Sequence, residues 1–353
     1  MWAVQNRTRF KADRAFARDE QGAEIWLVAV RATFTLHVDG TRVHVVLADD
    51  QQDVVIAPTY FGEPGQSSLR SDTDLVRTKS GTDILLHADA YAPGGRPARS
   101  VDVGFTLGPI AKQLRVVGDR VWRKSWRSVA PSDPEPFVSL PIRYEHAWGG
   151  VPADSDARDA YNPIGVGLDV TPGRPLPNVE AFGKPIESPR YEGRGAGFGP
   201  IACDWQPRLA LAGTYDDAWK RERQPRVPAD FDRAHFRSAP ADQQVDGFVR
   251  GGEEVVLRNL TPNGLLRFYL PYIAIGCRTK FGRDMVYHRC DLHTVIIEPT
   301  DSRLTMVWQS ALPCHRTLYT LEETIVFEKE RVLNGGRVQH IESEDTTLPE
   351  YVG

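Results

Sequence analysis

Cysteine is scarce in this sequence, with four residues in a chain of 353. Cys203, Cys277, Cys290 and Cys314 are irregularly spaced, and no two of them form a Cys-x-x-Cys pair. This pattern excludes the disulfide framework that holds small secreted domains together, so we expect free thiols in a reducing compartment. A chain of this length buries roughly 75% of its unfolded surface, and it therefore needs no covalent cross-links for stability.

Long apolar runs and blocks of one charge are also missing. No segment approaches the roughly 18 apolar residues of a membrane-spanning helix, and residues 1–20 lack the apolar core of a signal peptide. Lys and Arg total 43 against 47 Asp and Glu, a net charge of -4, and neither sign is concentrated in one stretch. We therefore expect a cytoplasmic protein that binds neither membranes nor nucleic acids.

Catalytic motifs are absent as well: there is no Gly-x-Ser-x-Gly, no His-Glu-x-x-His and no phosphate-binding loop ending in Gly-Lys-Ser/Thr. The glycine-rich residues 193–200 follow no predicted strand and precede no predicted helix, unlike a dinucleotide loop. Neighbouring carboxylates such as those of Asp216 and Asp217 point to opposite faces of a strand, whereas glycoside hydrolysis requires two that face each other. We expect no enzyme and no cofactor.

Glycine and proline, by contrast, are abundant, with 30 and 26 residues, and they place turn signals along most of the chain. Between these turns, apolar and polar residues alternate, as in residues 24–38, where Trp26, Val28 and Val30 share one face. A period of two predicts strands with one buried face. Because the alternation recurs in both halves of the chain, we predict an all-β fold of antiparallel sheets, sandwich or barrel-like, with only short helices.

Three turn sequences predict which strands pair. The dipeptide at residues 39–40, Asp-Gly, and the tripeptide at residues 262–264, Pro-Asn-Gly, supply the backbone conformations of tight hairpins. Residues 100–108 and 113–122 alternate in the same way and predict another antiparallel unit, in which Gly-Asp at residues 118–119 lies between two alternating stretches.

Residues 131–252 have a different composition, in which Pro, Gly, Asn and aromatic residues dominate and strand-length apolar runs are few. Disorder is disfavoured because the aromatic residues supply more apolar surface than disordered segments carry. We predict an ordered, loop-rich central insert packed on a β framework of residues 1–130 and 253–330, followed by a polar tail of residues 331–353. Asp216 is expected to cap a short helix near residues 215–223.

Four aspartates crowd into residues 69–93, which raises the question of a metal or catalytic site. No acidic ligand follows them at the spacing of a calcium loop. We therefore expect Asp74 and Asp83 to accept backbone N–H bonds at turns, with Arg77 or Lys79 as their charge partners. The four aspartates within residues 69–93 are Asp72, Asp74, Asp83 and Asp89.

A zinc site is the sharpest metal hypothesis, because His288, Cys290 and His293, with Cys314 or His315, are the residue types that bind zinc. On a strand, however, His288 and Cys290 point to one face and His293 points to the other. The short paired spacings of structural zinc sites are also missing. Buried thiols and polar strand residues explain the pattern more simply, and we predict no metal site.

Several segments, taken together and in order, resemble one bacterial family. They include LRSDTDLVRTKSGTDILLHADAYAP, LPIRYEHAWGG, YNPIGVG, WQPRLALAGTYDDAW and GGEEVVLRNLTPNG, and the resemblance runs from about Gln5 to past Trp308. Val227 stands where the family pattern has leucine, which is a conservative change. This family carries a domain-of-unknown-function label, and its members are encoded beside PAAR-like effectors of the type VI secretion system.

The resemblance implies a non-enzymatic adaptor or chaperone that binds a type VI secretion effector, or its PAAR-like domain, and assists loading onto the spike. It implies no catalytic or binding residues, and it leaves self-association open. The Trp, Tyr and Arg content of the insert is typical of interface hot spots, although burial between the insert and the sheets is the simpler explanation for any single aromatic residue. The alternative is a carbohydrate-binding or glycan-acting β protein. The candidate partner-binding residues are Trp148, Tyr161, Trp205, Tyr215, Trp219 and Phe231.

Overall fold

Three long strands organise the molecule. In the computed structural model, which describes residues 2–40, 42–126, 128–334 and 337–342, they are β3 (Glu24–Asp39), β20 (Asp284–Glu298) and β21 (Arg303–Pro313). They lie side by side in the largest sheet, whose strand order is β1-β22-β19-β20-β21-β3-β2. Strands β4 and β23 pair with β3 and β22, and β7 pairs with β20 in parallel. The remaining strands of this sheet are β1 (Ala3–Asn6), β2 (Lys11–Arg18), β4 (Arg42–Leu47), β7 (Asp83–Leu86), β19 (Ile275–Phe281), β22 (Leu321–Asn334) and β23 (Arg337–Glu342).

The two ends of this sheet approach each other, so that it nearly closes into a barrel. Arg14 on β2 donates through Nε to the Trp2 carbonyl at 2.7 Å, and Asn6 on β1 donates to the Phe10 carbonyl at 2.6 Å. Inside the barrel, the Trp26 indole donates to the Thr324 hydroxyl at 2.8 Å, which links β3 to β22. This near-closure brings the two edge strands together and so limits the exposed sheet edges that otherwise favour aggregation.

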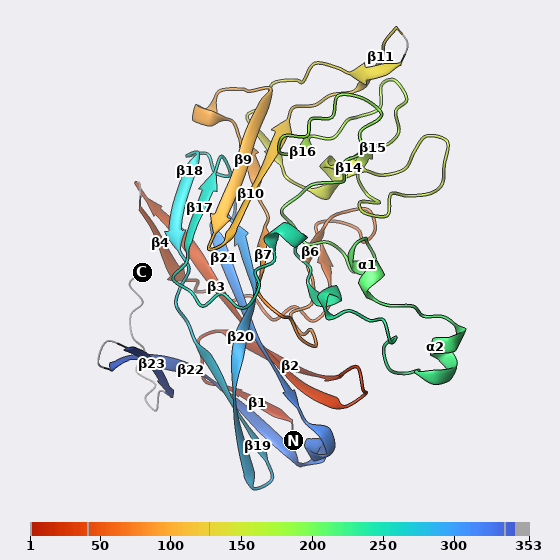
Figure 1. Ribbon diagram of the computed structural model, residues 1–353. Coiled ribbons are helices and arrows are strands. Elements are labelled where there is room, and N and C mark those ends of the chain that lie inside the picture. Colours follow the sequence, from red (N-terminus) through yellow and green to blue (C-terminus); the bar gives the residue numbers. More distant parts are fainter. Residues whose placement is uncertain (1, 41, 127, 335–336, 343–353) are drawn as a thin grey trace.

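A second, five-stranded sheet has the order β16-β10-β9-β17-β18 and lies over the other end of the long strands (Figure 1). One apolar core includes Phe105 and Leu257 from this sheet and Ile84, Val295 and Met306 from the larger one. The molecule is therefore a sandwich at one end and a near-barrel at the other, which confirms the predicted all-β class. The strands of the second sheet are β9 (Ser100–Leu107), β10 (Ile110–Val117), β16 (Val179–Ala181), β17 (Glu254–Arg258) and β18 (Leu265–Tyr269).

The segment from residue 131 to residue 252 consists mostly of ordered loops. It adds β16 to the edge of the second sheet and contains the two described α-helices, α1 (Arg208–Leu211) and α2 (Asp217–Glu222). Asp216 accepts a hydrogen bond from the Trp219 N–H at 2.8 Å and caps α2, as predicted. None of the described helices has the length and apolar character needed to cross a membrane.

Short elements complete the described chain. The two-stranded pairs are β5 (Thr59–Tyr60) with β6 (Leu69–Ser71), β8 (Asp89–Tyr91) with β13 (Ser139–Pro141), β11 (Trp122–Lys124) with β12 (Val129–Pro131), and β14 (Trp148–Gly149) with β15 (Val166–Gly167). The 3₁₀ turns are η1 (Pro93–Gly95), η2 (Tyr144–His146), η3 (Arg233–Phe236), η4 (Ala241–Gln243) and η5 (His315–Thr320).

Two of the three predicted turns join paired strands. The β3–β4 and β17–β18 hairpins form at Gly40 and Gly264, whose φ angles are 58° and 78°. The antiparallel unit of residues 100–108 and 113–122 is confirmed in the pairing of β9 with β10. Gly118 and Asp119 form no hairpin, however, because β11 pairs with β12 and not with β10. A Cβ at Gly118 would lie 1.8 Å from the Glu135 carbonyl oxygen, so this glycine is explained by a close backbone approach and not by a hairpin. Within the predicted tail, β22 continues to Asn334 and pairs with β23, while residues 343–353 lie outside the described residues.

Candidate functional site: the insert, its buried charges and its projecting arm

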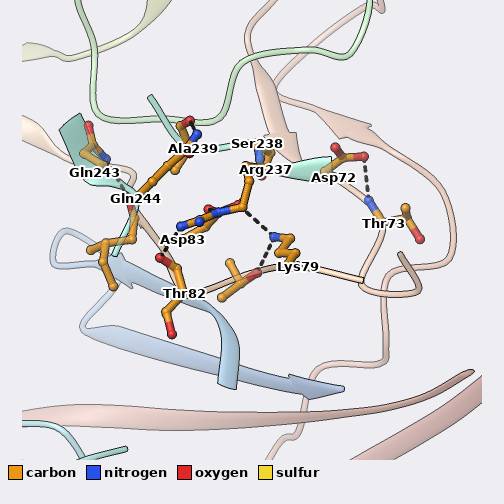
Figure 2. Close-up of polar contacts among 12 residues, drawn as sticks. Asp72, Thr73, Lys79, Thr82, Asp83, Arg237, Ser238, Ala239, Gln243 and Gln244 are labelled. Atoms are coloured by element: carbon orange, nitrogen blue, oxygen red, sulfur yellow. Dashed lines mark hydrogen bonds and ion pairs between the residues drawn. The ribbon is translucent and has the colours of Figure 1, made fainter. Parts of the chain in front are cut away.

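The aspartate-rich segment contains a fully buried carboxylate, Asp83, at the first position of β7. Three donors surround it: Lys79 Nζ at 2.8 Å, Arg237 Nε at 2.7 Å and the Ser238 N–H at 2.9 Å (Figure 2). Lys79 also donates to the Thr294 hydroxyl on β20 at 3.0 Å. We call Lys79, Asp83 and Arg237 the charge cluster, and it joins the insert to two strands of the larger sheet.

The electrostatics of the charge cluster favour an ionised Asp83. Burial by itself raises the pKa of this carboxyl, but the charges of Lys79 and Arg237 outweigh that effect and hold the pKa below its ordinary value. Arg237 also donates to the carbonyls of Thr82 and Val245, at 3.0 and 3.1 Å. Because the cluster is enclosed and its groups bind one another, it is built to hold the insert in place and offers no access to a substrate.

Two further aspartates of the same segment also hold distant arginines. Asp74 binds Arg31 of β3 at 2.9 Å and accepts a hydrogen bond from the Val55 N–H at 2.8 Å. Asp72 binds Arg208 of α1 at 2.8 Å. Burial raises the pKa of Asp74, and the Arg31 charge opposes that rise. Asp72 and Asp74 thus connect elements far apart in the chain, whereas the sequence led us to expect Asp74 to accept backbone N–H bonds at a local turn.

The predicted charge partners divide between two places. Lys79 is in the charge cluster, whereas the Arg77 guanidinium lies 5.8 Å from the centre of the Phe236 ring in η3. Arg31, Arg208 and Arg237 carried no signal in the sequence. They lie 43 to 154 residues from the aspartates they bind, and only the folded chain brings them together.

The two tryptophans proposed from the body of the insert are buried. Trp148 is 5% exposed and packs edge-to-face on Tyr191, with ring centres 5.0 Å apart. Trp205 is 4% exposed and packs in the same way on Tyr144, at 5.7 Å. Their positions account for the stability of the insert, since buried aromatic rings contribute large apolar areas.

Tyr161 and Phe231 are half-buried. The Arg194 guanidinium lies over the Tyr161 ring at 3.8 Å, a cation–π arrangement. Phe231 packs against Phe236 and His235, with ring centres 5.4 and 5.9 Å away. Both rings already have partners within the chain.

Tyr215 and Trp219 are placed differently, on a segment that projects from the body of the molecule. We call residues 212–231 the arm; it carries α2 at the right edge of Figure 1. Tyr215 is 52% exposed, and its ring contacts Trp219 edge-to-face with centres 4.7 Å apart. The Trp219 indole N–H donates to the Arg226 carbonyl at 2.7 Å, which fixes the ring against the returning chain.

The base of the arm is closed by hydrogen bonds between its two ends. The Thr214 hydroxyl donates to Asp230 at 2.7 Å, and the Asp232 N–H donates to the Leu211 carbonyl at 2.9 Å. Just beyond the arm, Arg233 binds Glu20 of the β2–β3 loop through two nitrogens, at 2.8 and 2.9 Å. The arm is therefore held at its base, with Tyr215 exposed and Trp219 half-buried beside it.

The residues considered for zinc bind other groups. His288 contacts the Thr279 hydroxyl through Nε2 at 2.8 Å and the Ser310 hydroxyl through Nδ1 at 2.6 Å. The Cys290 thiol lies 3.3 Å from the thiol of Cys277 on β19. Burial lowers the pKa of His288 to about 4, so the ring is neutral at pH 7. His288 is half-buried, and the two hydroxyls and two thiols are buried.

The other zinc candidates lie apart from that pair. The His293 ring stacks on Phe248 with centres 5.5 Å apart, and burial lowers its pKa to about 3. The Cys314 thiol donates to the Leu312 carbonyl at 3.4 Å, and the side chain of His315 lies outside the described residues. Among the side chains that are described, no three His, Cys, Asp or Glu residues gather as metal ligands would.

Together, the fold and this site define a class: an all-β protein in which a loop-rich insert is fixed by buried ion pairs and exposes an aromatic arm. The chain belongs to the bacterial family described as "uncharacterized protein conserved in bacteria (DUF2169)", which it matches over residues 21–309. The match runs from before β3 into β21 and includes the whole insert. Comparison with curated proteins found no match, and neither did comparison with solved structures.

Proposed function

We propose that this protein is a non-enzymatic adaptor or chaperone. In the cytoplasm it binds a type VI secretion effector, or the PAAR-like domain of that effector, and assists loading onto the spike. Two features support the proposal: the ordered series of segments that resemble the adaptor family, and the way the insert presents its aromatic residues. The DUF2169 family description by itself names no partner.

The observation that carries the proposal is the arm. Exposed Tyr and Trp side chains are the residues most enriched in binding hot spots, because they bury a large area at little cost in side-chain entropy. Tyr215 and Trp219 already contact each other, and the base of the arm is hydrogen-bonded. A partner would therefore meet a largely preorganised surface.

The charges around the aromatic pair suit the rim of such an interface. Asp216 and Asp217 precede Trp219, while Lys220 and Arg221 follow it in the last turn of α2. Their order places acidic groups at the start of the helix and basic groups at its end. An apolar centre with a polar rim of both signs is the usual organisation of a protein–protein interface.

The direct test is coexpression with the PAAR-like protein encoded beside this gene. We expect a stable complex on gel filtration and an increase in the soluble yield of the partner. If the partner is equally soluble alone and no complex elutes, the proposed function is wrong.

Within that complex, Tyr215→Ala is expected to weaken binding by about tenfold or more, because the exposed ring would be lost from the centre of the interface. Isothermal titration calorimetry of the purified proteins measures the change. Phe182→Ala is the matched control, since Phe182 is exposed to a similar degree but lies outside the arm. Equal affinities for the two variants would remove the arm from the interface.

A glycan-binding function gives a different result. The rings of Tyr215 and Trp219 meet at 71°, so they do not form the flat platform on which a sugar stacks. Binding to a glycan array that Tyr215→Ala abolishes, with no complex formed by the PAAR-like protein, would favour the carbohydrate alternative over the adaptor.

A further inference from the structure

The larger sheet contains a gap in its strand pairing along one side of β20. On that side β20 pairs with β19 as far as Cys290, and its pairing with β7 begins at Thr294. Across Asp291, Leu292 and His293, no described strand pairs with β20 on this side. A cavity of about 530 Å³ lies beside this stretch, and we call it the β20 groove.

The walls and floor of the β20 groove are largely apolar. Residues 247–250, which precede β17, and residues 272–274, which precede β19, form walls against the strands. The volume is within the range of cavities that take a small molecule or a few residues of peptide. The main apolar lining residues are Phe248, Val249, Ile273, Ile275, Leu292 and Trp308.

The charges that line the groove are predominantly positive. Arg250, Arg289 and Lys329 lie along it, against the single carboxylate of Asp291. That carboxylate already binds Arg289 Nε at 2.9 Å. The groove therefore presents two further cations beside an apolar floor, which is complementary to a ligand that is both apolar and acidic.

We propose that the β20 groove binds a short, extended segment of a partner protein in which an aromatic or long aliphatic residue adjoins Asp or Glu. The apolar side chain occupies the floor beside Leu292 and Trp308, and the carboxylate pairs with Lys329 or Arg250. The Leu292 carbonyl already accepts a hydrogen bond from the Thr82 hydroxyl at 2.6 Å, so the ligand is held by side-chain contacts. An extended segment fits better than a compact molecule because two consecutive stretches of chain, residues 247–250 and 289–292, line the groove. This inference rests on the proposed adaptor function, and it states the chemistry of the client segment.

Selection from a random nonapeptide library displayed on phage, with the full-length protein as bait, tests the proposal. We expect enriched peptides to place Asp or Glu within about three positions of an aromatic or long aliphatic residue, as ion pairing beside an apolar anchor requires. The most enriched sequence is then synthesised with a fluorophore and titrated by fluorescence anisotropy.

Charge reversal shows whether that peptide occupies the β20 groove. The double variant Arg250→Glu/Lys329→Glu is expected to weaken binding about tenfold or more, and a peptide with Lys in place of its acidic residues should recover affinity for this variant only. The variant Arg123→Glu/Lys184→Glu carries the same change of charge at exposed residues outside the groove and should bind as the unaltered protein does. Thermal unfolding of both variants checks that the fold is retained.

Three results would overturn the inference. The first is the absence of enriched acidic peptides, and the second is equal binding of the peptide by the groove variant and the unaltered protein. The third is a dimer in light scattering that Arg250→Glu/Lys329→Glu dissociates, because the occupant would then be a second copy of this chain.

Different results would contradict the adaptor proposal and the groove proposal. A client complex that Tyr215→Ala weakens but the groove variant does not would leave the adaptor standing and remove the groove. Peptide binding in the β20 groove without any client complex would support the groove and contradict the adaptor function.

Discussion

Replacing Asp83 by alanine is expected to lower the free energy of unfolding by about 3–5 kcal/mol, because it leaves two buried cations without their counter-charge. Lys79 and Arg237 have side chains only 5% and 4% exposed, so water cannot replace the carboxylate. The variant also loses the acceptor of the Ser238 N–H, which anchors the insert to β7. Urea denaturation at pH 7, followed by tryptophan fluorescence, measures the change.

Asp217→Ala is the matched control for that experiment. Asp217 also forms an ion pair, with Lys220 at 3.0 Å, but both side chains are largely exposed. Exposed pairs contribute about 0–1 kcal/mol, so we expect almost no change in the free energy of unfolding. If Asp83→Ala lowered the free energy of unfolding as little as Asp217→Ala does, the charge cluster would not be what holds the insert in place.

Acidification from pH 7 to pH 5 is expected to destabilise the folded protein strongly through three histidines, of which His87 and His293 are buried and His288 is half-buried. Burial lowers the pKa of His87 and of His288 to about 4, and that of His293 to about 3, from an ordinary 6.5. The unfolded chain therefore binds protons below about pH 6.5 while the folded chain does not. The stability is fully present above that pH and is lost as the pH falls toward 4.

The size of this effect follows from about 1.4 kcal/mol per pKa unit, which gives a loss of about 2 kcal/mol for each histidine between pH 7 and pH 5. The lowered pKa of Asp83 acts only below about pH 4 and does not enter this window. Urea denaturation at half-unit pH steps gives the profile. A free energy of unfolding that stays constant between pH 7 and pH 5 would show that these rings are not held neutral.

Two substitutions test whether the histidine rings cause the slope, which is the loss of unfolding free energy between pH 7 and pH 5. His288→Gln removes one titrating group that contacts two hydroxyls, and it is expected to reduce the loss between pH 7 and pH 5 by about 2 kcal/mol. His44→Gln, at an exposed position on β4, should leave the slope unchanged. Equal slopes for the two variants would contradict the assignment.

The sequence pattern predicted the structure correctly where the interacting residues are close together in the chain. The alternation that begins at Trp26 and the Asp-Gly turn at residues 39–40 correctly predicted β3, β4 and their pairing. The cap of α2 by Asp216 was predictable for the same reason, because donor and acceptor lie three residues apart. The glycine at residue 118 failed as a turn signal because its role depends on Glu135, which the sequence does not place beside it.

The contact between the two buried thiols was not predicted, although the sequence held a sign of it. Cys277 and Cys290 are on the two strands of one hairpin, and a register counted from Gly282 would have brought them close. Residues 277 and 290 match neither a Cys-x-x-Cys pair nor a zinc-ligand spacing, so those two motifs gave no sign that the thiols meet.

The sequence by itself determined the class of fold, the ordered insert and the family resemblance, because periodicity, turn chemistry and composition are properties of neighbouring residues. Tertiary structure alone decided what the aspartates and aromatics do. Asp83 meets Arg237 from 154 residues away, and Trp148 is buried while Tyr215 is exposed. Burial and long-range ion pairing depend on which parts of the chain come together in the fold. The pattern of neighbouring residues does not specify those contacts.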